Sequence, residues 1–249
     1  MGYSNLPACF TDQGFVAVNF EYHSFWRNLL SDIDRMPQPR ICSVFIKFAV
    51  LMNPFVHFLQ QYSHLGPAEL DQLQQVLTTK KYPAGHTILA AGSICAHISF
   101  IVSGKARSYF VDPSGQEFTW NFQFHDADSR FENFFLIDYN SFLTQSPSPL
   151  TFTAIEDTEV TQFSFEDLRT LMSQTIHAAT LASKMSEAAY QTVHKRAFTL
   201  LTLNARARYE LLLREEPHLL NKFQHYLIAS YIGVAPQSLS RLRKEISQP

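Results

Sequence analysis

The sequence contains few cysteines, and their positions do not predict a disulfide framework. Cys9, Cys42 and Cys95 are odd in number and widely spaced, which argues for a reducing compartment, and they lack the spacing of iron–sulfur ligands. Long apolar runs are also missing: the longest, residues 41–51, includes Lys47 and is well below the roughly 18 residues of a membrane span. Acidic residues within the first 40 positions argue against a signal peptide. We therefore expect a cytoplasmic protein with no membrane segment.

Familiar catalytic motifs are absent as well. The sequence has no GxSxG, P-loop or GxGxxG pattern, and its ten histidines show no HxH or HExxH spacing. His86, His97 and His125 lie in regions expected to form strands and could meet in space. A metal-dependent jelly-roll enzyme is thus a minor alternative; otherwise we expect no enzyme activity, no metal and no cofactor.

Charge is divided unevenly along a chain that is long and apolar enough to fold. With 249 residues and 46% hydrophobic content, one or two packed domains are expected. Residues 195–249 contain nine Lys or Arg and four Glu, a net charge of +5, whereas residues 1–194 have a net charge of −7. A basic C-terminal module on an acidic body is expected if only that module approaches phosphate groups.

Residues 225–245 predict a DNA-binding helix-turn-helix. Gly233 supplies the left-handed backbone that ends the first helix, and Pro236 occupies the first turn of the second, where its missing N–H costs nothing. Apolar or small side chains recur where two crossed helices must touch, at Ile228, Ala229, Ile232, Val234, Leu239 and Leu242. The alternative is an ordinary helical hairpin with a solvated polar face.

The second of these helices has the composition of a recognition helix. Its outer side would present Gln237, Ser238, Ser240, Arg241 and Lys244, residue types that bind base edges and phosphates in a major groove. Double-stranded DNA is therefore the expected partner.

The spacing of apolar residues separates the remaining chain into segments. Residues 1–51 show no clear pattern, and Met52 looks like a natural start, so we expect an N-terminal extension that is weakly folded or a start-site artefact. Residues 52–165 predict a helical lead-in and a β-domain, with turn signals about every tenth residue from 81 to 164.

Two strand pairs are expected within this β-domain. Residues 105–111 and 116–124 predict a hairpin around a Pro- and Gly-containing turn, with the aromatic face of the second strand in the core. Residues 150–155 and 159–163 predict a second pair that closes the barrel.

Residues 166–201 predict a dimerisation helix ahead of the helix-turn-helix domain of residues 202–249. From 176 to 200, apolar residues recur at an average step near 3.4, which approximates a coiled-coil seam. We expect two chains to pair along it as a homodimer. The alternative is that the seam packs only on its own barrel.

The order of helical lead-in, β-barrel, long helix and helix-turn-helix resembles the Crp/Fnr superfamily of transcription regulators over about residues 52–246. The phrases that carry the resemblance are YPAGHTILAAGS (82–93), FIVSGKARSYFVDPSGQE (100–117), YNSFLTQSPS (139–148), AIEDTEV (154–160) and IASYIGVAPQSLSRLRKEI (228–246). The resemblance implies an α+β fold: a double-stranded β-helix (jelly-roll) domain of the cyclic-nucleotide-binding type, a long dimerisation helix and a C-terminal helix-turn-helix domain. RNA polymerase is a further candidate partner. Because the sequence ends at Pro249, we expect no full β-wing beyond the recognition helix.

The resemblance also assigns roles within the recognition helix. Gln237 and Arg241 align with base readers, whereas Ser238 and Lys244 align with phosphate contacts. Pro236 occupies a position where other members carry a base-contacting side chain.

The effector site of the family is altered in this sequence. The family's phosphate cassette needs a Gly-Glu pair and an Arg-Ser or Arg-Ala pair, and the corresponding positions are Ile137-Asp138 and Ser148-Pro149. Because a buried phosphate without a cationic partner is costly, we predict no tight binding of cyclic AMP. Arg130 would replace the missing arginine only if residues 125–130 folded over the pocket.

The candidate effector pocket is assigned to Asp138, Tyr139 and Ser148, with the effector unknown. As an alternative function, the chain would be a sensor or scaffold with a cyclic-nucleotide-binding-like barrel that does not bind DNA.

Overall fold

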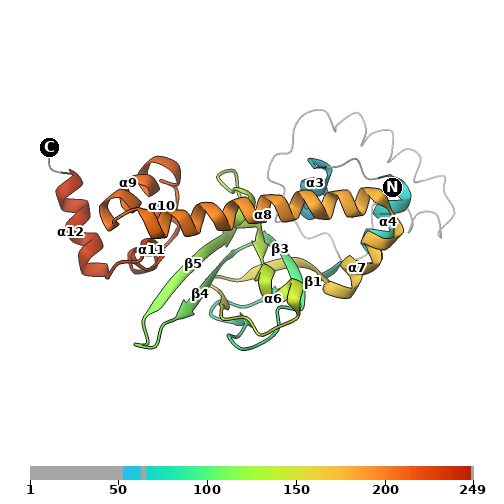
Figure 1. Ribbon diagram of the computed structural model, residues 1–249, viewed down its shortest axis with the longest axis horizontal. Helices are drawn as coiled ribbons and strands as arrows, with labels where there is room; N and C mark the ends of the chain where they lie inside the picture. The colour runs from blue at the N-terminus through green and yellow to red at the C-terminus, as the bar shows by residue number, and fades with distance from the viewer. Residues whose placement is uncertain (1–52, 63–65, 248–249) are drawn as a thin grey trace, which may run out of the picture. The chain divides into compact units, whose positions relative to one another are not determined.

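The computed structural model describes residues 53–62 and 66–247 (Figure 1). All elements below belong to the unit of residues 50–249. The predictions for residues 1–51, including a start at Met52, lie outside the described residues. No helix of the described ranges is both long enough and apolar enough to cross a membrane.

Two helices precede the β-domain, α3 (Pro54–Gln60) and α4 (Pro67–Val76). Asn53 begins α3, because its side-chain oxygen accepts a hydrogen bond of 2.9 Å from the backbone N–H of Phe55. The apolar side chains of α3 are buried against the strands: Phe55, Val56, Phe58 and Leu59. This packing anchors the helical lead-in to the core of the β-domain.

The β-domain consists of two four-stranded antiparallel sheets, which confirms the predicted jelly roll. The first sheet has the order β1 (Thr78–Tyr82), β8 (Thr158–Ser164), β3 (His97–Ser103) and β6 (Phe135–Leu136). The second has the order β2 (Thr87–Leu89), β7 (Thr151–Ala154), β4 (Lys105–Val111) and β5 (Glu117–Phe124). The short helices α5 (Phe131–Phe134) and α6 (Tyr139–Thr144) lie between strands β5 and β7 in the sequence.

The β4–β5 hairpin is confirmed, with Val111 opposite Glu117 and Lys105 opposite Phe124. Asp112 orders its turn by accepting hydrogen bonds from the backbone N–H groups of Ser114 and Gln116. Such side-chain-to-backbone bonds are the reason that Asp is favoured at turn positions.

The second predicted strand pair is wrong. Strand β7 pairs with β2 and β4, whereas β8 pairs with β1 and β3 in the other sheet. The turn between them transfers the chain across the jelly roll, and the hydroxyl of Thr158 fixes the crossing through the backbone oxygens of Glu156 (2.7 Å) and Lys105 (3.1 Å). Alternating hydrophobicity shows which residues of a strand are buried but not which strand lies beside it.

Strand β5 is buried on both faces. Phe122 and Phe124 belong to the hydrophobic core of the C-terminal helices rather than to the core between the two sheets. Thr119 and Gln123, on the opposite face, are also buried. The aromatic face is therefore core at Phe122 and Phe124, as predicted, whereas Phe118 and Trp120 are only half-buried. The layer that covers Phe122 and Phe124 is the C-terminal one.

Six helices follow the jelly roll: α7 (Phe165–Gln174), α8 (Ile176–Thr202), α9 (Ala205–Glu215), α10 (Leu219–Lys222), α11 (His225–Ile232) and α12 (Pro236–Ser247). Figure 1 shows α8 as the long orange helix that runs from α7 past the strands to the last four helices. Thr175 caps α8 by accepting a 3.0 Å hydrogen bond from the N–H of Ala178, and Asn204 caps α9 by accepting a 2.9 Å bond from the N–H of Ala207. We call residues 203–247 the C-terminal module.

Candidate nucleic-acid interface

Helices α11 and α12 form the predicted pair around Gly233. Gly233 has left-handed backbone angles (φ 69°, ψ 45°), and Val234 continues the turn with a 2.9 Å bond from its N–H to the oxygen of Ala229. A Cβ atom on Gly233 would lie 3.0 Å from the ring of Phe118. Both the backbone conformation and the available space therefore favour glycine.

Helix α12 presents one face to the protein and another to solvent. Leu239 is 1% exposed and packs with Ile228 and Ile232 of α11 in the core of the C-terminal module. All six side chains assigned to DNA are exposed: Pro236, Gln237, Ser238, Ser240, Arg241 and Lys244. The fold thus brings these residues together on the solvent side of a single helix.

Two cations of α12 differ from three other cations of the C-terminal module. Arg206, Arg214 and Lys222 each form an ion pair with a carboxylate. Among the described residues, Arg241 and Lys244 lie within 4 Å of no carboxylate. Within the described part of the chain their charge is therefore not neutralised by a carboxylate and is available to phosphates.

Arg243 has a different role from its neighbours on α12. Its Nη1 atom lies 2.9 Å from Nε2 of His225 at the start of α11. This contact connects the two helices, so Arg243 is better described as a structural residue than as a DNA contact.

The C-terminal module is attached to the edge of strand β5 by Ser230 of α11. Strand β5 ends its sheet, so part of its backbone has no strand partner. The Ser230 hydroxyl accepts a 2.7 Å hydrogen bond from the N–H of Thr119 and donates a 2.9 Å bond to the oxygen of Glu117. One side chain thus bonds both a donor and an acceptor of this edge.

Arg196 of α8 joins the same edge to the same helix. Its Nη2 atom donates to the backbone oxygen of Thr119 at 3.2 Å and also to the backbone oxygen of Tyr231. Its guanidinium carbon lies 3.8 Å from the centre of the Tyr231 ring, a favourable cation–π geometry. Arg196 therefore contacts the jelly roll and α11 at once, and its burial lowers the pKa of the guanidinium.

Aromatic and ionic contacts extend this attachment. The rings of Phe122 on β5 and Phe223 in the C-terminal module stack with their centres 4.0 Å apart. Lys222 forms an ion pair of 3.0 Å with Asp128 in the loop after β5. The resulting interface is mixed, with an apolar centre and hydrogen-bonded surroundings, and fixes α11 relative to the jelly roll.

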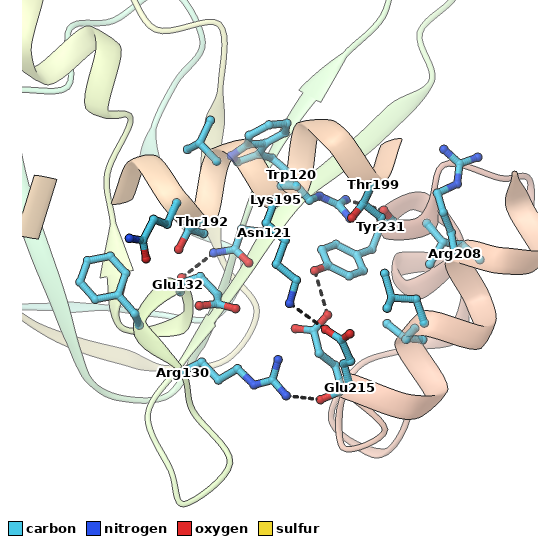
Figure 2. A pocket seen from close by; sticks show the side chains of 18 of the residues that line it. Trp120, Asn121, Arg130, Glu132, Thr192, Lys195, Thr199, Arg208, Glu215 and Tyr231 are labelled. Carbon is cyan, nitrogen blue, oxygen red and sulfur yellow. Dashed lines mark hydrogen bonds and ion pairs between the residues drawn. The ribbon is translucent and has the colours of Figure 1, made fainter. Parts of the chain in front are cut away.

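A polar cavity of about 410 Å³ lies at this junction, between β5, α5, α8, α9 and α11. Figure 2 shows Lys195 and Arg130 both reaching toward Glu215. The distance from Nζ of Lys195 to the Glu215 carboxylate is 2.7 Å. Burial, reinforced by the charge of Glu132, raises the pKa of Glu216, whose carboxylate accepts a 3.2 Å bond from the hydroxyl of Tyr231.

Arg130 therefore forms its contacts at this junction and not at the effector pocket. It donates to the backbone oxygen of Glu215, and it is not among the residues that line the candidate effector pocket.

The candidate effector pocket is a second cavity, of about 530 Å³, beside α6 and α8. Asp138 and Tyr139 line it, and burial raises the pKa of the Tyr139 hydroxyl to about 12. Ser148 is 1% exposed and lies behind Asp138, to which its hydroxyl donates a 2.7 Å hydrogen bond. The structure thus brings the three residues together, with two of them in the wall.

Two of the three histidines of the alternative metal site have other partners. His125 lies 3.1 Å from the backbone oxygen of Ile101, and burial lowers its pKa. His86 stacks on Tyr82 with ring centres 5.3 Å apart, while His97 lies on β3. Within residues 53–62 and 66–247, no three His, Cys, Asp or Glu side chains are grouped closely enough to bind a metal ion.

Helix α8 packs on its own chain along part of the predicted seam. Ala189 is buried, and Met185 packs against the core of the jelly roll. Several large apolar side chains of α8 remain exposed, namely Ile176, Tyr190, Val193, Phe198 and Leu201. The last four define what we call the apolar stripe, which lies in the second half of the helix.

Ser230 and Arg196, which attach the C-terminal module to β5, were not indicated by the sequence patterns. Both form hydrogen bonds with Thr119, which is far away in the sequence. The separation is 111 positions for Ser230 and 77 positions for Arg196. The available signal was a polar residue in the apolar run of α11, since Ser230 is flanked by Ala229 and Tyr231.

Comparisons with known proteins agree with this architecture. The family model of the cyclic nucleotide-binding domain matches residues 79–175, and no curated protein matches the sequence. FixK2 from Bradyrhizobium japonicum has a similar structure, with a TM-score of 0.56, 18% identity, and coverage of 69% of this chain and 84% of that chain. The c-di-GMP responsive global regulator CLP from Xanthomonas campestris gives a TM-score of 0.53 and 13% identity, covering 73% and 91%.

A Crp/Fnr family regulator from Eubacterium rectale is also similar, with a TM-score of 0.53 and 19% identity over 73% of this chain and 83% of that chain. Residues 79–175 therefore match the cyclic nucleotide-binding domain, and the chain shares the fold of these Crp/Fnr-type regulators.

Proposed function

We propose that this chain is a transcriptional regulator of the Crp/Fnr type that binds double-stranded DNA with α12, a regulatory rather than enzymatic role. The observation that carries the proposal is the outer face of α12, where Arg241 and Lys244 are exposed and have no carboxylate partner in the described chain. Gln237 and Arg241 have the chemistry to read base edges, and Ser238 and Lys244 have the chemistry to bind phosphates. Pro236 and Ser240 complete the surface.

The active form in this proposal is a homodimer paired along the apolar stripe of α8. Phe198 is 61% exposed and Leu201 is 85% exposed, and burying a side chain of this size is worth about 1.5–3 kcal/mol. A second copy of the same helix would cover them. Pairing would also set two recognition helices about 34 Å apart, the repeat of one DNA turn. RNA polymerase is a candidate partner of the DNA-bound dimer.

The proposal assigns the effector to the cavity beside Asp138 and Tyr139, with Ser148 as support, and excludes tight binding of cyclic AMP. The supporting observation is chemical: no Lys, Arg or His is among the described residues that line the cavity. A cyclic phosphate there would lack a charge-assisted hydrogen bond.

Helix α8 is the proposed connection between effector and DNA. Ser186, Ala189, Tyr190 and Val193 form the α8 wall of the effector cavity, and Arg196 follows within one turn. Because Arg196 bonds both β5 and α11, a shift of α8 caused by an effector would be transmitted to the C-terminal module.

The proposal is tested by selecting binding sites from random DNA duplexes with the full-length protein and titrating the selected duplex by fluorescence anisotropy. We expect two chains per duplex and an affinity that falls steeply with salt. An absence of salt-sensitive binding to every duplex would favour the alternative of a sensor or scaffold that does not act on DNA.

A further inference from the structure

The cavity beside α6 and α8 has a largely apolar wall. Phe110 and Trp120 border it from the β4–β5 hairpin, and Tyr190 borders it from α8. Ile137, Leu143, Pro149, Leu150, Ala189 and Val193 add aliphatic surface. Its volume of about 530 Å³ lies within the range of small-molecule sites, roughly 300–1,000 Å³.

Asp138 is the charged residue among those that line this cavity, and its carboxylate already has partners. One oxygen accepts from the backbone N–H groups of Asn140 (3.1 Å) and Ser141 (3.3 Å) at the start of α6. The other accepts the 2.7 Å bond from the hydroxyl of Ser148. Asp138 therefore holds α6 in place, and its negative charge disfavours an anionic ligand nearby.

Tyr139 divides this cavity from another one. Tyr139, Leu143 and Ser186 line both the effector cavity and an apolar cavity of about 420 Å³ between α4, α7 and α8. In the second cavity the charged lining residue is Glu69, whose carboxylate is bonded by the N–H of Gly66 at 2.7 Å and by His177 at 3.0 Å. The described walls of both cavities thus lack a cation.

We propose that the effector cavity binds an uncharged, largely apolar molecule that contains a ring, held between Trp120, Phe110 and Tyr190. These three aromatic side chains come from the β4–β5 hairpin and from α8, and aromatic rings favour stacking or edge-to-face contacts with a planar ligand. Ala189 is 6% exposed, and its small side chain leaves the floor of the cavity open. That such a ligand acts as an effector rests on the proposed function, but its binding to the cavity does not.

Two probes that share one ring system test the charge preference. N-phenyl-1-naphthylamine is uncharged, and 8-anilino-1-naphthalenesulfonate adds a sulfonate to the same frame. We expect the full-length protein to bind the uncharged probe saturably in a fluorescence titration, at least tenfold more tightly than the sulfonate, and to show no calorimetric signal with cyclic AMP. Equal or tighter binding of the sulfonate, or no saturable binding of the uncharged probe, overturns the proposal.

Two matched substitutions on α8 locate the probe. Ala189→Leu fills the effector cavity and should weaken binding of the uncharged probe at least tenfold, whereas Ala182→Leu fills the neighbouring cavity and should change it less than twofold. The reverse result places the ligand in the other cavity and overturns the assignment. If Ala189→Leu fails to fold, Leu150→Trp, at a half-buried position that lines only the effector cavity, provides the same test.

These measurements contain no DNA, so they separate the two proposals. Probe binding with no DNA binding contradicts the proposed function alone. DNA binding without probe binding contradicts the ligand assignment alone.

Discussion

Replacing Ser230 by alanine removes the hydroxyl that joins α11 to the edge of β5. The N–H of Thr119 then loses its 2.7 Å partner and the oxygen of Glu117 loses a 2.9 Å partner. Thr119 is 0% exposed, so water does not readily replace the lost bond. A buried donor left without a partner costs about 1–3 kcal/mol.

The expected effect is local, because the bond joins two parts of the chain that each have their own core. Hydrogen exchange of the Thr119 amide reports it directly, since this N–H is protected by a residue of the C-terminal module. A loss of about 1–3 kcal/mol corresponds to exchange that is about 5- to 150-fold faster. Amides in β1 and β8, which pair within the other sheet, should exchange as in the wild type.

Ser240→Ala is the matched control. Its hydroxyl bonds only the backbone oxygen of Pro236 in its own helix, so the same substitution in the same module should leave exchange at Thr119 unchanged. If the Thr119 amide of the Ser230→Ala variant exchanges at a rate within twofold of the wild-type rate, α11 does not protect the edge of β5. The described attachment would then not operate in solution.

Three further predictions concern charge and assembly. Burial raises the pKa of Glu216 above its ordinary value of 4.5, so the fold loses stability as pH rises through the folded-state pKa. Glu216→Gln should therefore match the wild-type Tm at pH 4 and exceed it at pH 8. Identical Tm values of the two proteins at both pH values would contradict the assignment. Phe198→Glu should convert the dimer to a monomer in sedimentation experiments, because it places a charge on the apolar stripe. Val111→Glu, also at an exposed apolar position, should remain a dimer. If the Phe198→Glu protein is still a dimer, the apolar stripe is not the dimer interface. Lys244→Ala should weaken binding to all duplexes evenly and reduce the salt slope by about one, and an unchanged slope would show that Lys244 contacts no phosphate.

Local patterns predicted the elements of this fold better than their partners. The turn before β5 was predicted from Pro113 and Gly115, and the helix-turn-helix from Gly233 and Pro236. Proline fixes the backbone angle φ at its own position, and glycine allows the left-handed conformation that other residues avoid, so both signals are local. The pairing of β7 and β8 was wrong, because alternation carries no information about the neighbouring strand.

The covering of β5 shows the same limit. The sequence indicated that Phe122 and Phe124 are buried, but burial alone does not say which layer buries them. The structure places the C-terminal helices there.

The candidate site likewise contains residues that the sequence could predict and residues that it could not. The outer face of α12 follows from helical periodicity, so Gln237 and Arg241 could be assigned from the sequence, and the structure places both in solvent. The attachment through Arg196 and Ser230 could not, since a hydrogen bond between residues 77 or 111 positions apart has no local signature. Long-range side-chain contacts of this kind require coordinates.

The central claim is that α12 reads DNA sequence, and the most direct test compares Arg241→Ala with Arg169→Ala. Arg169 lies on α7 and pairs with Glu166 at 3.5 Å, so it serves as a control for the loss of one exposed arginine. Fluorescence anisotropy with the selected duplex and with a scrambled duplex measures both variants at one salt concentration. We predict that Arg241→Ala loses about 1–3 kcal/mol of binding to the selected duplex and discriminates less between the two, while Arg169→Ala behaves as the wild type. Wild-type affinity and discrimination in Arg241→Ala would contradict the account.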